Sequence, residues 1–564
     1  MRKIRLGWLC FAVAALVVNL PARADELDDL ARDFWSWRAA EQPISSDDIP
    51  RLERPAGWTP DWSPAAVARY RKQLTEFESR WTKIDASRWP VPRQVDYRLM
   101  GSAIARVRWE LEVTRNWQRH PLFYLDQSLG AYFHLLLPPP PFDATRAQQI
   151  IATLNSIPAT IDAAKQNLTQ PVGPFAQLAL AQLQDIRPRL QASVRELKPV
   201  LGAEHSPGLD QASEKAIVAL ESYRDWITQR LPTMSTQNAV GREAYIFFLK
   251  NVALIPYTPE ELLQMGRAEW ARSVAFQTYE EQHNLGQPQM TMAKDQAEEM
   301  ARVEKDELAV RRYLEAHDIL TVPGWMQHYR FLPLPAYLSP LSGIGEEDDF
   351  TGPSRLKDPS TRYIPRPSPD LGYFALATAK DTRPDLVHEG VPGHYFQLAL
   401  GWADPDPIRR HYYDSGANEG LGFYAEEMMQ EAGLFDDSPR TREIIDNFMR
   451  LRALRVEVDV KLALGEFTIE QGAEYLAKTV PMDTKTAHAE AASFASGPGQ
   501  AISYQIGKLQ IMKFLADARR QQGDGFKLRA FHDFLWQNGN VPISLQRWEY
   551  LGLRDDLDAL EKLH

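Results

Sequence analysis

A short stretch of this chain, residues 385–397 (DLVHEGVPGHYFQ), contains two histidines on either side of a glutamate. The whole sequence of 564 residues has only 12 histidines. A hydrolytic zinc site needs imidazole and carboxylate ligands, an open position for water, and a base beside that water. His388 and His394 are therefore candidate ligands, and Glu389 is the candidate base. A pair of histidines with structural roles is the alternative.

The spacing of these histidines departs from the H-E-x-x-H pattern, in which a four-residue step places both rings on one helix face. His388 and His394 are six residues apart. On a regular helix six residues turn through about 600°, which leaves the rings roughly 120° apart around the axis. Both rings can face one ion if the helix is deformed at Pro392-Gly393, because proline removes an amide donor and glycine tolerates unusual backbone angles. We therefore expect a backbone distortion there.

A second segment, residues 414–431 (DSGANEGLGFYAEEMMQE), supplies carboxylates that could complete such a site. Its apolar residues recur at three- and four-residue steps, which is typical of an amphipathic helix. Glu419 and Glu426 share a different face of that helix. Glu419 is the candidate third ligand and Glu426 a candidate supporting residue, with His411 and Asp414 as lower-ranked ligands. The alternative is that both glutamates are solvated charges.

Residues 441–464 form another periodic helix, and Arg455 falls on its apolar stripe. Asp459, four residues on, can pair with it. A charge pair on an apolar face either ties helices together or contacts the substrate. Arg455 is therefore a candidate substrate-binding residue.

The segment 496–507 (SGPGQAISYQIG) is predicted to be a glycine-proline loop that opens a helix. Gln500 and Tyr504 lie one turn apart on it. A tyrosine hydroxyl can stabilise a developing oxyanion, so Tyr504 is a candidate catalytic residue and Gln500 a candidate substrate-binding residue. A core tyrosine whose hydroxyl is satisfied internally is the alternative.

Most of the other segments are predicted to be helical. Residues 211–230 have clear helical periodicity, and capping boxes at Thr258 and Thr468 begin two more helices. The best strand candidates are 321–326 and 372–378.

Residues 339–370, rich in Pro, Gly, Ser and Asp, are predicted to form a long loop. A boundary near residue 240 is expected to separate an N-terminal helical region, 25–240, from a region that holds every candidate site residue, 241–564.

The first 24 residues resemble an export signal, with a basic start, an apolar run from Leu6 to Leu20 and a small-x-small site that predicts cleavage after Ala24. We expect a periplasmic or secreted protein that is not held in a membrane after cleavage. An uncleaved membrane anchor is the weaker alternative, because the apolar run is shorter than the roughly 18–20 residues needed to span a bilayer. Lipoprotein processing is not expected, since Cys10, the single cysteine, lies inside the apolar run.

The composition excludes several classes of function. The net charge is −11, and −15 without the first 24 residues, which hold four basic and no acidic side chains. Such an acidic protein is not expected to bind nucleic acid. The sequence also lacks the G-x-S-x-G, Walker A and G-x-G-x-x-G motifs, so serine-hydrolase and nucleotide-binding chemistry have no local support.

Three motifs, HEGVPGH, NEGLGFYAEE and SGPGQAISYQIGKL, together resemble the bacterial domain-of-unknown-function family number 885. Members of that family carry the same H-E-x-x-P-G-H stretch. The family is in turn similar to the helical gluzincin peptidases, the group of angiotensin-converting enzyme and carboxypeptidase Taq. The resemblance implies a mainly α, two-lobed fold with a central cleft and a small β element near the zinc-binding motif.

The resemblance also implies a role for each motif residue. His388, His394 and Glu419 match the zinc ligands, Glu389 matches the general base, and Tyr504 lies roughly where an oxyanion-binding tyrosine is found. Residues 372–378 match an edge strand that pairs with the substrate backbone. The implied function is an exported zinc metallopeptidase that hydrolyses small peptides. The alternatives are a metal-dependent hydrolase of a non-peptide amide or ester, and a non-catalytic periplasmic binding protein without the metal.

Overall fold

The computed structural model describes residues 26–44 and 52–564, so the predicted signal peptide and its cleavage site lie outside the described residues. The first part of the chain contains helices α1 (Glu26–Glu41), α2 (Pro64–Trp81), α3 (Val91–Arg108), α4 (Asn116–Arg119), α5 (Pro121–Leu125), α6 (Ala131–Leu136), α7 (Ala144–Asn167), α8 (Gly173–Gln182), α9 (Ile186–Leu201) and α10 (Ser206–Arg230).

The second part is also mainly helical. Its α-helices are α11 (Arg242–Phe247), α12 (Pro259–His283), α13 (Gln296–Ala316), α14 (Tyr373–Lys380), α15 (Arg383–Asp385), α16 (His394–Trp402), α17 (Pro407–His411), α18 (Ser415–Glu431), α19 (Pro439–Leu464), α20 (Ile469–Thr479), α21 (Thr484–Ser496), α22 (Ile502–Gln522), α23 (Leu528–Gln537), α24 (Ile543–Leu551) and α25 (Asp555–Lys562).

Shorter elements interrupt these helices. The π-helical turns are η1 (Trp109–Thr114), η2 (Asp126–Gly130), η5 (Phe248–Val252) and η8 (Leu386–Gly390). The 3₁₀ turns are η3 (Ala203–His205), η4 (Leu231–Thr233), η6 (Ser339–Leu341), η7 (Pro353–Arg355) and η9 (Gly523–Gly525). The prediction of a mainly α fold is confirmed.

Several helix starts follow directly from the sequence. Thr258 and Thr468 form the predicted capping boxes at the starts of α12 and α20, each with its side chain accepting from the third residue of the helix. The predicted helices 211–230 and 441–464 fall within α10 and α19.

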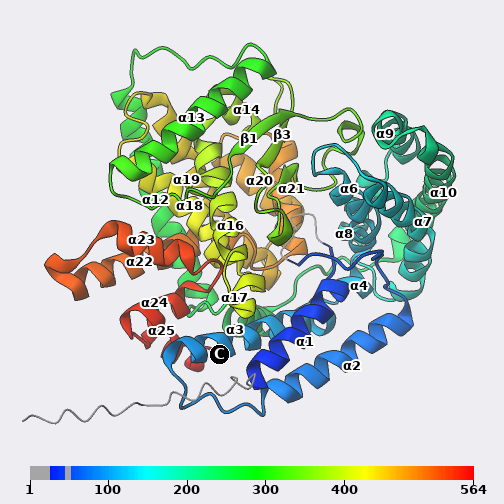
Figure 1. The fold of residues 1–564 in the computed structure, drawn as a ribbon, viewed down its shortest axis with the longest axis horizontal. Coiled ribbons are helices and arrows are strands. Elements are labelled where there is room, and N and C mark those ends of the chain that lie inside the picture. The colour runs from blue at the N-terminus through cyan, green and yellow to red at the C-terminus, as the bar shows by residue number, and fades with distance from the viewer. Residues whose placement is uncertain (1–25, 45–51) are drawn as a thin grey trace, which may run out of the picture.

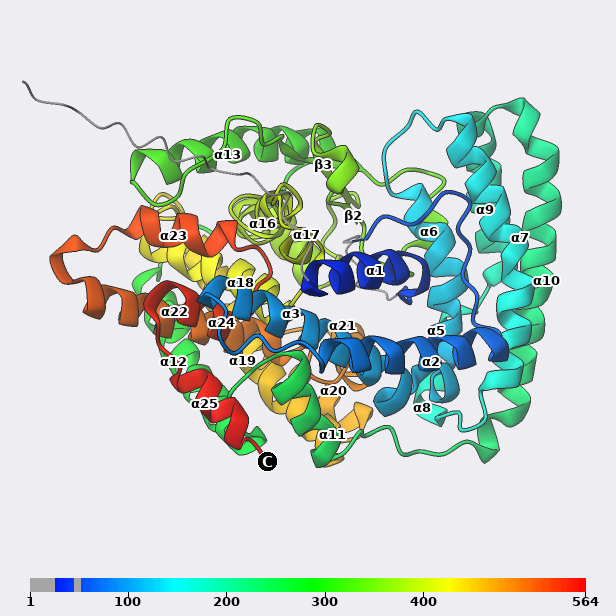
Figure 2. The ribbon, with the colours of Figure 1, turned by 60° about the horizontal axis from the view of Figure 1, so that its bottom comes forward.

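The helices form two groups in space (Figure 1). The long helices α7 and α10 pack against each other at one end of the molecule, as Figure 2 shows. Helices α12, α16, α18, α19 and α22 lie in the other group, where α12 packs on α19 and α18 packs on α22. The buried apolar residues of helices α1 to α10 form one cluster, which also includes Ile408 and Trp548 from the second part of the chain. The predicted boundary near residue 240 stays a prediction.

A small mixed sheet lies beside the second group, with strand order β1-β3-β2. Strands β1 (Tyr329–Pro333) and β3 (Ser360–Ile364) are parallel, and β2 (Asp348–Asp349) is antiparallel to β3. The sheet touches the motif region, because a Cβ on Gly390 would lie 2.6 Å from the ring of Tyr329. The predicted small β element near the motif is therefore present.

Both strand predictions were nevertheless wrong. Residues 372–378 form most of helix α14, and residues 321–326 form a loop that precedes β1. A short apolar run fits a buried helix as well as a strand, and the two alanines in 372–378 favour the helix only weakly. The predicted long loop, 339–370, contains β2 and β3, so it is partly strand.

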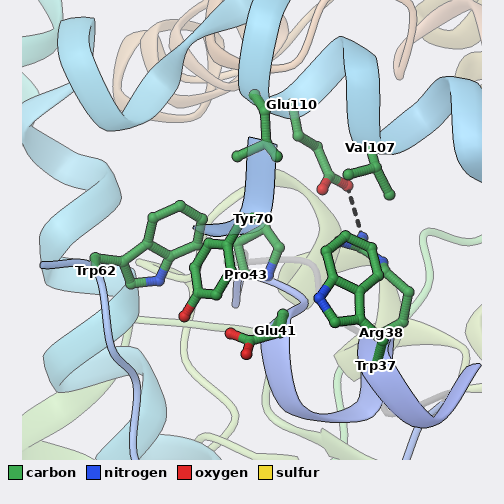
Figure 3. A pocket seen from close by; sticks show the side chains of 9 residues that line it. Trp37, Arg38, Glu41, Pro43, Trp62, Tyr70, Val107 and Glu110 are labelled. Carbon is green, nitrogen blue, oxygen red and sulfur yellow. Dashed lines mark hydrogen bonds and ion pairs between the residues drawn. The ribbon is translucent and has the colours of Figure 1, made fainter. Parts of the chain in front are cut away.

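A small cavity lies among helices of the N-terminal region, lined by aromatic and charged side chains including Trp37, Arg38, Trp62 and Glu110 (Figure 3). Its volume of about 10 Å³ is enough for roughly one water molecule. Within residues 26–44 and 52–564, no helix combines the length and apolar character that crossing a bilayer requires.

Candidate metal centre

The backbone leaves the helix between the two motif histidines. His388 lies in the π-helical turn η8, Val391 is extended, the Val391–Pro392 peptide is cis, and α16 begins at His394. Gly393 is required here by close contact, because a Cβ at this position would lie 1.7 Å from the carbonyl oxygen of His388. The expected distortion is thus a complete break between two helices. The separation of roughly 120° that a continuous helix would impose on the two histidine rings therefore does not apply.

This break brings the two imidazoles together with a carboxylate of α18. Ligand atoms of His388, His394 and Glu419 all lie within 4.8 Å of one another, and all three residues are buried. Glu419 Oε2 is 3.1 Å from His394 Nε2 and 3.5 Å from His388 Nε2. The ring centroids of the two histidines are 4.7 Å apart at an interplanar angle of 79°.

Glycine on α18 provides the space for these rings. Gly422 lies three residues after Glu419, and a Cβ there would lie 3.0 Å from Cε1 of His394 and 3.2 Å from Cε1 of His388. A side chain at this position would therefore force the two rings to shift from their present places. Asp414 caps the start of the same helix by accepting a hydrogen bond from the Ala417 amide at 2.9 Å.

Glu426 is not one of the three candidate ligands, but it contacts His388 and fixes the orientation of its ring. Its Oε1 is 2.6 Å from His388 Nδ1, so Nε2 of that ring is the nitrogen turned toward Glu419. Arg452 of α19 lies 3.3 Å from the same carboxylate oxygen through its Nη2. The guanidinium of Arg452 is itself enclosed by aromatic rings, including Phe448 at 4.9 Å and Phe423 at 5.5 Å.

The electrostatics of the cluster favour positive charge at its centre. Burial lowers the pKa of His388, but hydrogen bonds and charge from Glu419 and Glu426 outweigh it and raise that pKa to about 10. Burial raises the pKa of Glu419, yet the two imidazoles outweigh burial and hold that pKa well below its usual range. A metal cation satisfies the same carboxylates while leaving both imidazoles neutral.

The residues present fit a zinc ion. Two imidazole nitrogens and one carboxylate oxygen are a common donor set of catalytic zinc sites, which keep the fourth position for water or substrate. Donor atoms at about 2.0–2.1 Å from a tetrahedral ion are separated by about 3.3–3.4 Å, and the two separations measured to Glu419, 3.1 and 3.5 Å, bracket that value. His388, His394 and Glu419 are therefore the residues that would hold the ion.

Glu389 is the partly exposed residue of the motif. Its side chain is 23% exposed, whereas His388 and His394 are buried. Its Oε1 is 3.9 Å from Nη1 of Arg362 in β3. Arg362 is fixed by Asp348 of β2 at 2.6 Å and by Asp385 at 3.3 Å, so the sheet fixes a guanidinium next to the candidate base.

Tyr504 of α22 packs against the ring of His388. Its ring stacks on the His388 imidazole with centroids 6.2 Å apart and an interplanar angle of 15°. The tyrosine is partly buried, and its hydroxyl makes no hydrogen bond to any residue of the described parts of the chain. The hydroxyl therefore lacks the internal partner that a structural tyrosine would have.

The predicted pair between Arg455 and Asp459 was wrong. Arg455 pairs with Glu490 of α21 through two contacts, Nε at 2.6 Å and Nη2 at 2.8 Å. Asp459 accepts hydrogen bonds from the amides of Gly499 and Ala501 at 2.8–3.1 Å and from the hydroxyl of Tyr245. The amides before α22 have no partner within the helix, so they bind the Asp459 carboxylate in preference to Arg455, its neighbour on α19.

Gln500 and His411 both contact residues outside the ligand cluster. Gln500 accepts a hydrogen bond from Ser415 at 2.8 Å and so connects the loop before α22 to the start of α18. His411 of α17 packs against Trp35, with ring centroids 5.9 Å apart, and lies outside the ligand cluster.

Sequence reasoning missed Arg362, Arg452 and Glu490. Arg452 had a usable signal, because it lies three residues before Arg455 on the same apolar helix. Arg362 of β3 and Glu490 of α21 are brought to the site by tertiary packing. Nothing in the sequence around either residue indicates that it lies there.

Comparison with known proteins places this architecture in a family. The family model described as "Bacterial protein of unknown function (DUF885)" matches residues 52–548. A search of curated proteins found no match.

Two solved structures share the fold. One, described as "a putative lipoprotein of unknown function" from Shewanella oneidensis, has a TM-score of 0.70 and 16% identity over 93% of this chain and 98% of its own. The other, described as "the putative lipoprotein" from Colwellia psychrerythraea, has a TM-score of 0.73 and 15% identity over 96% of this chain and 100% of its own. Because the family model spans most of its length, the chain belongs to the DUF885 family of bacterial proteins of unknown function.

Proposed function

We propose that this protein is a zinc-dependent metallopeptidase that hydrolyses small peptides. The observation that carries the proposal is the convergence of His388, His394 and Glu419 within 4.8 Å, with Glu389 next in sequence to one ligand. When bound, zinc supplies Lewis acidity, which makes water a stronger acid and a carbonyl carbon a better electrophile.

The residues of this chain would carry the proton and hold the substrate. Glu389 takes a proton from the attacking water onto its carboxylate and passes it to the nitrogen of the leaving amine. The Tyr504 hydroxyl donates to the oxygen on which negative charge develops. The Arg362 guanidinium, 3.9 Å from Glu389, supplies positive charge beside the base, and Glu426 fixes the ring of His388.

Metal analysis and a peptide assay on the purified protein test the proposal. We expect about one zinc ion per chain after dialysis against zinc, and hydrolysis of short peptides that a chelator abolishes and added zinc restores. Absence of bound zinc would instead favour a binding protein, and zinc-dependent cleavage of esters or non-peptide amides alone would favour a different hydrolase.

We also propose that the protein is exported to the periplasm or secreted. Two solved structures that share the fold are each described as a "putative lipoprotein", and the first 24 residues have the pattern of a signal peptide. Sequencing the N-terminus of the protein recovered from the periplasm tests cleavage after Ala24.

A further inference from the structure

Arg455 is a firmly fixed charged side chain next to the candidate metal centre. The residue is 5% exposed, and two of its guanidinium nitrogens contact the Glu490 carboxylate at 2.6 and 2.8 Å. The guanidinium also lies 4.5 Å from the ring centroid of Tyr504 and 5.7 Å from that of Phe494. Its orientation is therefore set before any substrate arrives.

One nitrogen of this guanidinium remains available. Nη1 of Arg455 makes no hydrogen bond to any residue of the described chain, and it is not among the fully enclosed polar atoms. The nearby Arg452 differs, because its Nε and Nη1 have no partner and are fully buried among aromatic rings. Of these two arginines, Arg455 is thus the one that can donate to a molecule in the site.

The position of Arg455 places this donor close to the reacting groups. Tyr504 is the shared neighbour, since its ring contacts the Arg455 guanidinium and also stacks on His388. Phe374 of α14 lies 5.7 Å from the same guanidinium and contributes to this wall of the site.

The charge around Arg455 indicates what the free donor binds. Glu490 already neutralises the guanidinium in a two-contact pair. A carboxylate bound at Nη1 would place a second negative charge next to Glu490, which already neutralises this guanidinium, and its loss of hydration would be only partly compensated. A neutral carbonyl oxygen brings no such charge and accepts a charge-assisted hydrogen bond.

We propose that Nη1 of Arg455 donates to a backbone carbonyl of the substrate, so that peptides need no free C-terminal carboxylate to be recognised. The inference rests on the proposed peptidase function and specifies its substrate class. Substrates are then peptides held through their main chain, with amidated and free-acid forms accepted alike.

A matched pair of peptides, identical except for a C-terminal carboxylate or amide, tests this inference. We expect the wild-type protein to have kcat/KM values for the two within about fivefold. Arg455→Gln should lower both by a similar factor of about 10–100, as expected for a hydrogen bond to a charged group. Arg442→Gln is the matched control, because Arg442 lies on the same helix α19 and pairs with Glu280 at 3.0 Å.

Glu490→Gln gives the sharper comparison. Without Glu490 the guanidinium carries an uncompensated charge, so we expect the preference for the free acid over the amide to rise by tenfold or more. Unchanged kcat/KM in Arg455→Gln would overturn the inference. A wild-type preference for the free acid above about 100-fold that disappears in Arg455→Gln would also overturn it, because Arg455 would then bind the carboxylate.

Calorimetric binding of the same two peptides to zinc-loaded Glu389→Gln protein separates this inference from the proposed function. Similar affinity for both peptides that weakens with Arg455→Gln supports the inference even if no peptide is ever cleaved. Hydrolysis without any effect of Arg455→Gln on binding or kcat/KM would overturn the inference alone. Circular dichroism and zinc content confirm that each variant is folded and loaded.

Discussion

His388 and Glu426 are in direct contact: Nδ1 of the ring lies 2.6 Å from Oε1 of the carboxylate. Glu426 is on the same helix, α18, as the candidate ligand Glu419. One helix therefore provides both a ligand and the group that orients another ligand. A carboxylate in this position selects the tautomer of the imidazole and increases its basicity.

Removing the charge of Glu426 should weaken metal binding. We expect Glu426→Gln to lower zinc affinity by about 10–100-fold, as is typical for groups that support a ligating histidine. Competition with a fluorescent chelator measures the affinity. Glu431→Gln is the control, because Glu431 is an exposed residue at the end of the same helix. Equal affinity in Glu426→Gln and wild type would show that this contact does not support the metal.

Glu389 should be needed for turnover and dispensable for the metal. We expect Glu389→Gln to bind zinc as wild type does and to lower kcat by about 10²–10⁴-fold, because the amide cannot accept a proton. Zinc content by mass spectrometry and steady-state peptide hydrolysis provide the two measurements. Hydrolysis at the wild-type rate would mean that another group is the base.

The hydroxyl of Tyr504 should act on the transition state. We expect Tyr504→Phe to lower kcat by about 10²–10³-fold with little change in KM, in line with the loss of one oxyanion donor. The stacked ring is retained in this variant, so zinc affinity and thermal stability should stay at wild-type values. A rise in KM with kcat unchanged would assign the hydroxyl to ground-state binding instead.

Gly422 should matter more for metal binding than for folding. In Gly422→Ala the new methyl group would lie 3.0–3.2 Å from both imidazole rings, so we expect at least a tenfold loss of zinc affinity. Crowding of a packed site costs about 1–3 kcal/mol and the gain in helix propensity returns up to about 1 kcal/mol, so the protein without metal should stay folded and lose at most about 2 kcal/mol of stability. Gly525→Ala, where a Cβ meets nothing within 4 Å, is the control.

Buried neutral histidine should make the protein sensitive to acid. Burial lowers the pKa of His532 to about 4, and its two nitrogens are 2.9 Å from the Ile319 carbonyl and the Tyr424 hydroxyl. The unfolded chain takes up this proton near pH 6.5, so the stabilisation is present above that pH and is lost as the pH falls toward 4.

Between pH 7 and 5 this one histidine should cost about 2 kcal/mol of unfolding free energy. We expect His532→Gln to lose correspondingly less stability than wild type over that range, measured by urea unfolding at each pH. Parallel losses in the two proteins would contradict the assignment.

The sequence was sufficient to predict the parts of the site that depend on local pattern. Glu419 and Glu426 follow from helical periodicity, and the capping residues Thr258 and Thr468 mark helix starts because their bonds are made within one turn. The Pro392-Gly393 break could be placed, but its form could not, since it depends on how α16 packs after the break.

Contacts between residues far apart in the sequence could not be predicted from local patterns. Arg455 was expected to pair with Asp459, but each found a partner from α21 or the loop before α22. The run 372–378 was read as a strand because its composition does not separate a buried strand from a buried helix, and tertiary contacts decide between them.

The contact between α18 and α22 has a further consequence. A Cβ on Gly420 would lie 2.5 Å from Cα of Gly507, so the two backbones touch without intervening side chains. Glu419 precedes one glycine by one residue, and Tyr504 precedes the other by three. Relative sliding of the two helices is therefore blocked, and any adjustment to a bound molecule has to come from the surrounding segments. Evolution or engineering of new specificity is then expected to change α14, α21 or the small sheet and to leave this pair of helices alone.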